Sequence, residues 1–88
     1  MIFLIEYDRR TRRTLLFKTF KDTERHQAQE HRLEMELDRN REGLLLQREI
    51  LLLEARNEKA LRRTHERYFE NLSEDVKSSI RCSSLVLV

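Results

Sequence analysis

Near its start the chain carries the run Ile2-Phe3-Leu4-Ile5-Glu6-Tyr7, and a second run of the same kind follows at Leu15-Leu16-Phe17-Lys18-Thr19-Phe20. Short runs rich in aromatic and β-branched residues favour strands. The segment between the two runs is polar and short, which suits the turn of a hairpin. The sequence therefore predicts a β-hairpin over residues 2–20.

A long helix is expected next. Asp22 or Thr23 can serve as its N-cap, and Glu24 places negative charge in the first turn, where the helix dipole favours it. Helix-forming residues continue to Glu42, and Gly43 then occupies the position at which a glycine commonly ends a helix. The prediction is a helix over residues 22–42.

The segment after Gly43 allows two interpretations. Residues 49–55 hold an apolar core bounded by charge, which fits either a strand buried on both faces or a stretch of buried helix. Leucine is the better helix former, but a glycine that ends the preceding helix favours a strand. We therefore expect a third strand here.

A second helix is expected after Asn57, a good N-cap residue. Its apolar side repeats at helical spacing, through Leu61, His65, Tyr68 and Leu72. This stripe predicts that all four side chains face the sheet.

Together these elements predict an α+β fold, a small ββαβα sandwich with two helices packed on one face of a three-stranded sheet. A crossover through the first helix gives the strand order 2-1-3, with the first strand central. Residues 1–76 form the expected single domain, and residues 77–88 a polar connection with an apolar tail. If residues 85–88 join the sheet, it becomes four-stranded.

Two other architectures fit parts of the pattern. Residues 22–76 could form a helical hairpin or coiled coil that bends at Gly43, since this stretch is dense in Glu, Arg and Leu and lacks Pro. Residues 15–20 followed by two helices also resemble the order of ribbon-helix-helix DNA-binding proteins. That resemblance covers the middle of the chain only and carries no specific motif.

Composition limits the function classes. The 88 residues are 39% hydrophobic and 39% charged, and the longest apolar runs are far shorter than the roughly 20 residues that cross a bilayer. We expect no membrane partner and no secretory signal, and the lone Cys82 favours a cytoplasmic setting. No phosphate loop, metal-ligand spacing or catalytic motif is present, so we expect no enzyme activity, no cofactor and no small-molecule substrate.

A basic cluster gives the sharpest candidate binding site. Residues 9–21 contain six basic and no acidic side chains, and four of the basic ones fall at the expected hairpin tip. Guanidinium groups can bind phosphates or carboxylates in pairs of hydrogen bonds. The candidate side chains for a nucleic acid or an acidic protein partner are Arg9, Arg10, Arg12 and Arg13. The competing interpretation is that the acidic first helix neutralises them, through Glu30, Glu34 or Asp38.

Two polar side chains of the second helix's apolar stripe are candidates for burial, His65 and Tyr68. A histidine among apolar neighbours could act as a base or pH switch beside the Tyr68 hydroxyl. A histidine in this position more often packs its ring and hydrogen-bonds the sheet.

Self-association is the remaining prediction. In the first helix Leu33 and Leu37 lie nearly opposite Ala28 and Met35, so one patch should cover the sheet and leave Met35 for a partner helix. The candidate interface residues are Met35, Leu51 and Leu53. With one sheet face open and an apolar third strand at the edge, the sequence predicts a homodimeric interaction module. The alternative is a nucleic-acid-binding or regulatory protein that uses residues 9–13.

Overall fold

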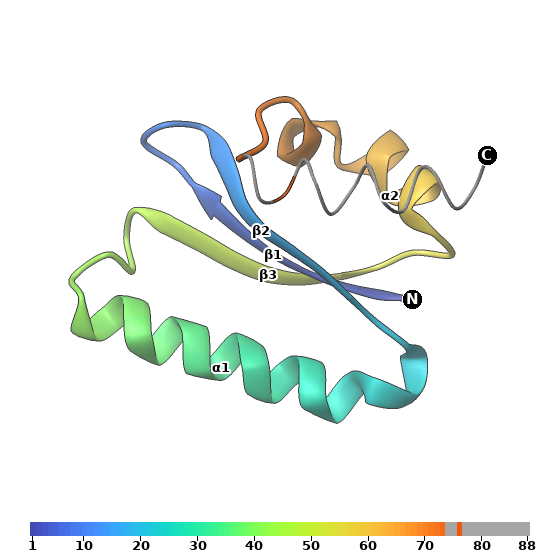
Figure 1. Ribbon diagram of the computed structural model, residues 1–88, viewed down its shortest axis with the longest axis horizontal. Coiled ribbons are helices and arrows are strands. Elements are labelled where there is room, and N and C mark those ends of the chain that lie inside the picture. The colour runs from blue at the N-terminus through green and yellow to red at the C-terminus, as the bar shows by residue number, and fades with distance from the viewer. Residues whose placement is uncertain (74–75, 77–88) are drawn as a thin grey trace.

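A computed structural model describes residues 1–73 and 76 of the chain. Three strands, β1 (Ile2–Asp8), β2 (Arg13–Phe20) and β3 (Arg48–Glu54), form one antiparallel sheet in the order β2-β1-β3. Helix α1 (Arg25–Arg41) connects β2 to β3, and helix α2 (Glu58–Thr64) follows β3 (Figure 1). The α+β class, the three strands and their order are as the sequence predicts.

The β1–β2 hairpin forms because both strands carry apolar residues toward both faces of the sheet. All seven residues of β1 are buried, as expected for the central strand. The ladder shifts register between Glu6 and Tyr7, so that Leu15 is the extra residue of a bulge in β2. The turn ends at Arg12, whose φ of 57° is in the left-handed region.

The first helix begins with one 3₁₀ turn, η1 (Asp22–Glu24), before α1. The Glu24 side chain accepts a hydrogen bond from the Lys21 amide at 2.8 Å, so the cap lies at Lys21 rather than at the expected Asp22 or Thr23. The helix ends at the predicted glycine. Gly43 has a φ of 74°, a conformation that residues with a Cβ rarely adopt.

The segment after Gly43 is a strand. β3 pairs with β1 without interruption from Ile2 opposite Glu54 to Asp8 opposite Arg48. The helical hairpin is therefore wrong, because the two helices are separated by a strand that pairs with the sheet centre. The ribbon-helix-helix resemblance fails for the same reason.

The two helices lie on opposite faces of the sheet (Figure 1), which corrects the prediction that both pack on one face. Ala28 of α1 packs with Ile2, Leu4 and Phe20 on one side. On the other side the buried cluster is Phe3, Ile5, Tyr7, Leu61 and Tyr68. Because β1 is apolar on both faces, each face needs its own cover.

The second helix is shorter than its stripe predicts. α2 ends at Thr64, where His65 adopts φ −133° and ψ 50°, and a 3₁₀ turn, η2 (Glu66–Phe69), follows. Asn57 is the N-cap as predicted, since its side chain accepts a hydrogen bond from the Ala60 amide at 2.8 Å. The break at His65 rotates the residues after it, so Leu61 and Tyr68 are buried while His65 and Leu72 are only partly buried.

The chain returns to the edge of β2 after η2. The Thr14 amide donates to the Asn71 carbonyl at 2.9 Å, and the Ser73 amide donates to the Thr14 carbonyl at 3.0 Å. These bonds make one isolated bridge between Thr14 and Leu72, and no fourth strand forms in residues 1–73. The tail that was expected to supply one, residues 85–88, lies outside the described residues.

Candidate interaction surfaces

The arginine-rich tip lies where the sequence predicts it, in the turn between β1 and β2. Asp8 organises the turn, because its Oδ1 accepts a hydrogen bond from the Arg10 amide at 3.0 Å. Burial alone would raise the pKa of Asp8, but the hydrogen bonds from Arg10 and Gln47, together with the charge of Arg48, lower it below its ordinary value. Asp8 therefore stays ionised and holds the base of the turn.

Two of the four tip arginines either contact the β3 side of the chain or are partly buried. The Arg9 amide donates to the Gln47 carbonyl at 2.9 Å, and its guanidinium donates to the Leu46 carbonyl at 3.2 Å and lies 3.7 Å from a Glu49 carboxylate oxygen. Arg13 is half-buried, and its Nε has no hydrogen-bond partner among the described residues. Of the four candidate side chains, Arg13 is therefore only partly accessible to a ligand.

Arg10 and Arg12 remain available. Both are exposed, and neither forms an ion pair within residues 1–73 and 76. The acidic helix does not neutralise the tip, since Glu30 pairs with His26 at 2.9 Å and Asp38 with Arg41 at 3.5 Å. The candidate anion site is thus reduced to two exposed guanidinium groups on one turn.

A buried carboxylate on the α1 face was not foreseen from the sequence. Glu6 is 4% exposed and accepts hydrogen bonds from Arg39 Nε at 2.6 Å and from an Arg48 guanidinium nitrogen at 2.7 Å. The bond to Glu6 raises the pKa of Arg39, although burial acts in the opposite direction. These contacts fasten the end of α1 to the central strand. The sequence signal was an acid between two apolar residues of the first strand, Ile5 and Tyr7.

A second polar cluster joins η2 to β3 on the opposite face. The Tyr68 hydroxyl donates to Glu49 Oε1 at 2.7 Å, and Arg67 contacts the same carboxylate at 2.5 Å. Burial raises the pKa of Tyr68, and the hydrogen bond to Glu49 and its negative charge raise it further. The Arg67 guanidinium lies over the Tyr7 ring at 5.2 Å and over the Tyr68 ring at 4.9 Å.

The pairing of His65 with the Tyr68 hydroxyl is absent, because that hydroxyl is bound to Glu49. The two rings stack instead, with centroids 6.3 Å apart. The imidazole Nδ1 lies 2.8 Å from the Thr64 hydroxyl, and the ring is only partly buried. Burial is therefore correct for Tyr68 and wrong for His65.

The candidate interface side chains lie inside the chain's own packing. Met35 packs against the Ile2 and Leu4 cluster, so the Ala28 side of α1 covers the sheet and the expectation that Met35 is left for a partner helix is wrong. Leu51 and Leu53 pack against the cluster on the other face and remain partly exposed. The leucines that α1 and the following loop expose are Leu33, Leu37, Leu45 and Leu46.

The outer edge of β3 is an open surface in the part of the chain that the structure describes. β3 has β1 as its only neighbour in the sheet, and its middle residues, Ile50 to Leu53, carry no charge, proline or bulge. Such devices normally protect an edge strand from pairing with another chain. The β2 edge differs, because Thr14 already bonds to residues 71–73.

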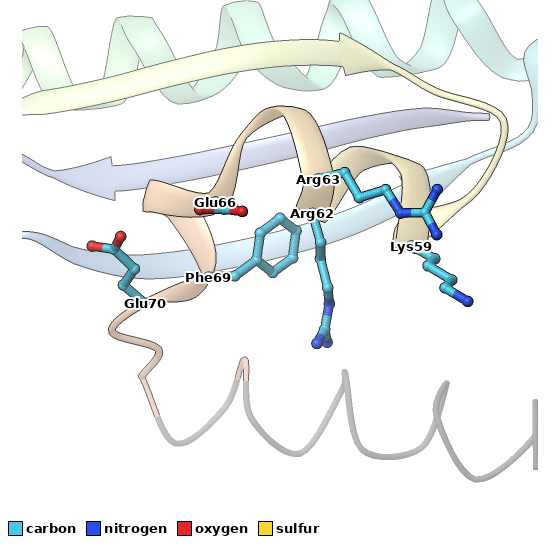
Figure 2. Close-up of a pocket in the computed structure, with 6 residues that line it drawn as sticks. All are labelled: Lys59, Arg62, Arg63, Glu66, Phe69 and Glu70. Atoms are coloured by element: carbon cyan, nitrogen blue, oxygen red, sulfur yellow. The ribbon is translucent and has the colours of Figure 1, made fainter.

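A pocket of about 380 Å³ lies on the outer side of α2 and η2. Figure 2 shows Lys59 and Arg63 toward one end and Glu66 and Glu70 toward the other. The Arg62 guanidinium covers the Phe69 ring at 5.1 Å. The pocket therefore mixes both signs of charge around a ring that is already covered on one side.

Among the described residues, no group of three or more His, Cys, Asp or Glu side chains is arranged to hold a metal ion. In the same residues, no helix has the length and apolar character needed to cross a bilayer. Comparison with known proteins finds no matching family model, no matching curated protein and no matching solved structure.

Proposed function

We propose that this protein is a non-enzymatic interaction module that works through self-association. The observation that carries the proposal is the open edge of β3, with its unprotected apolar centre. A row of unpaired backbone groups beside apolar side chains is a template for another strand. A second copy of the chain can supply that strand and cover both edges at once.

The closed sheet faces restrict how copies can meet. The sequence predicts two dimer surfaces, an open sheet face and the edge of the third strand. The sheet face is not open, because Leu61, Tyr68 and Phe69 cover it. The edge and the exposed leucines of α1 are therefore the surfaces that support the proposal.

Sedimentation velocity across the micromolar range tests self-association directly. We expect the weight-average sedimentation coefficient to rise with concentration from that of one chain to that of two. A single monomeric species at every concentration would overturn the proposal.

A second candidate function is binding of nucleic acid at the hairpin tip, which the exposed Arg10 and Arg12 favour. Phosphate contacts release counterions, so binding would weaken steeply as salt is raised. On a heparin column, Arg10→Glu with Arg12→Glu should elute at clearly lower salt than the parent chain. The matched control is Arg56→Glu with Arg63→Glu, which makes the same change in net charge at one exposed residue before the cap of α2 and one on α2 itself. Equal shifts for both pairs would show that only net charge acts.

The proposed setting is the cytoplasm, because a chain with the single thiol of Cys82 cannot form an internal disulfide.

A further inference from the structure

We infer that two copies pair antiparallel through their β3 edges in one register, centred on Leu51, and that α1 of each copy packs beside α1 of the other. This inference rests on the proposed self-association and names its surface.

The hydrogen bonds at the two ends of β3 show which residues point outward. Met1 and Ala55 exchange two backbone bonds, of 2.9 and 3.1 Å, and the Arg9 amide donates to the Gln47 carbonyl at 2.9 Å. In an antiparallel ladder, hydrogen-bonded pairs recur at every second residue. The odd-numbered residues of β3 are therefore bonded to β1. The even-numbered residues direct their N–H and C=O groups to the free edge, and they are Arg48, Ile50, Leu52 and Glu54.

Symmetry and charge select the register. In a two-fold antiparallel pair, outward-pointing residues must face outward-pointing residues. With Leu51 on the axis, Arg48 faces Glu54 of the partner subunit and Ile50 faces Leu52 of the partner subunit. All four outward residues are then paired, with opposite charges at the ends and leucine or isoleucine between them.

Neighbouring registers are poorer. A centre at Leu52 brings Ile50 opposite a glutamate and leaves Arg48 facing Arg56 of the partner subunit. A centre at Ile50 places Glu54 opposite Leu46 of the partner subunit, in the loop before the strand. Opposite charges across a strand pair are favourable and like charges are not, so the register centred on Leu51 is preferred.

The outer side of α1 carries an exposed leucine that is displaced toward the β3 edge. Arg25 forms an ion pair with Glu54 of β3, whereas His31 contacts Phe20 of β2 with ring centroids 6.1 Å apart. At about 100° per residue, Leu33 lies about 80° round the helix from Arg25, away from His31. Leu33 is thus about 140° from the sheet-facing Ala28, on the solvent side of the helix but displaced toward β3 rather than β2, and it is 53% exposed.

Helix α1 runs beside β3 in the direction opposite to the strand, since Arg25 lies near Glu54 while Arg39 and Arg48 meet at Glu6 (Figure 1). Leu33 is close to the middle of this span, as Leu51 is close to the middle of β3. A two-fold axis through Leu51 therefore brings Leu33 near Leu33 of the partner subunit. The dimer contact would then bury both the free edge of β3 and Leu33, which is exposed to solvent in a single chain.

Disulfide trapping tests the register. Leu51 is bonded to β1 and not to the partner, so the two copies of residue 51 form a non-hydrogen-bonded pair with Cα atoms about 4.5 Å apart, within the range of a disulfide. In a Cys82→Ser background, Leu51→Cys should form a covalent dimer rapidly under mild oxidation. The matched control is Leu53→Cys, whose two copies would lie about 13 Å apart along the strands and should not cross-link.

The outcomes separate the two proposals. A dimer in sedimentation whose residue 51 does not cross-link, or which cross-links at Ile50→Cys or Leu52→Cys instead, overturns the register and leaves self-association standing. A chain that is monomeric throughout removes both.

A surface variant provides a test that spares the core. Leu33→Glu should weaken the dimer at least tenfold in dissociation constant with an unchanged circular dichroism spectrum. The matched control is Gln27→Glu, which makes the same change in net charge on the exposed β2 side of α1 and should leave dimerisation unchanged. Equal dissociation constants for the two variants would overturn the helix contact.

Discussion

Leu61→Ala should destabilise the fold by about 3 to 4 kcal/mol. Leu61 is 0% exposed and fills the space between the β1 side chains and Tyr68. Three carbon atoms are lost, at about 0.8 kcal/mol each, or about 2.4 kcal/mol. The neighbouring aromatic rings are rigid, so a cavity persists, and about 50 Å³ of it would add about 1.2 kcal/mol at about 24 cal/mol per Å³.

Equilibrium urea denaturation, followed by far-ultraviolet circular dichroism at one fixed protein concentration, measures this loss. Concentration must be held constant because dimerisation adds to apparent stability. Leu46→Ala is the matched control, since that side chain is 89% exposed and its removal should change stability by less than about 0.5 kcal/mol. A loss below about 1 kcal/mol for Leu61→Ala would show that α2 does not cover this face of the sheet.

Three further outcomes concern the polar clusters. Glu6→Gln removes the charge that two guanidinium groups share and should cost about 3 to 5 kcal/mol in the same denaturation assay, whereas Glu34→Gln on the exposed side of α1 should be nearly neutral. The folded pKa of Asp8 lies below its unfolded value, so the contribution of Asp8 to folding stability is present above about pH 4 and is lost as pH falls through the folded pKa. The stability difference between the parent and Asp8→Asn should therefore shrink in acid. A difference that stays constant with pH would contradict this. Glu49→Gln should lower the raised pKa of Tyr68 toward its ordinary value, measured by ultraviolet titration with the other tyrosine replaced by phenylalanine.

Local signals in the sequence were sufficient for the order of elements. Apolar runs marked the strands, Gly43 marked the end of α1 and Asn57 the start of α2. Each signal acts within a few residues, through strand propensity, a left-handed φ or a cap. The strand order followed from the short hairpin and the crossover rule.

The packing face of α1 could not be predicted, because the helix has two apolar patches. Leu33 and Leu37 form the larger one, yet the helix turns Ala28 and Met35 to the sheet. On that same side Arg39 reaches the buried Glu6, whose charge requires a partner. These two residues are far apart in the chain, so the helical periodicity of the sequence does not predict their contact.

An unmarked helix break and a contact between distant parts of the chain account for the errors in the candidate sites. The helical stripe brings His65 into the core only if the helix continues past Thr64, and no glycine or proline in the sequence marks the break at His65. Arg9 lies beside Glu49 of β3. The spacing of the β1–β2 hairpin does not predict this neighbour, because β3 comes much later in the chain. Tyr68 was placed correctly because the 3₁₀ turn returns it to the sheet.

The Glu6 contacts also determine how β3 is aligned with β1. A strand whose centre reads Ile-Leu-Leu-Leu presents similar side chains to both faces, so its apolar residues alone cannot distinguish one alignment from the next. A slip of one residue would turn Arg48 to the opposite face, away from Glu6, and would part Glu54 from Arg25. The charged residues at the two ends of β3 thus determine the register of β3 against β1. The leucines stabilise the sheet but do not select one register over the next.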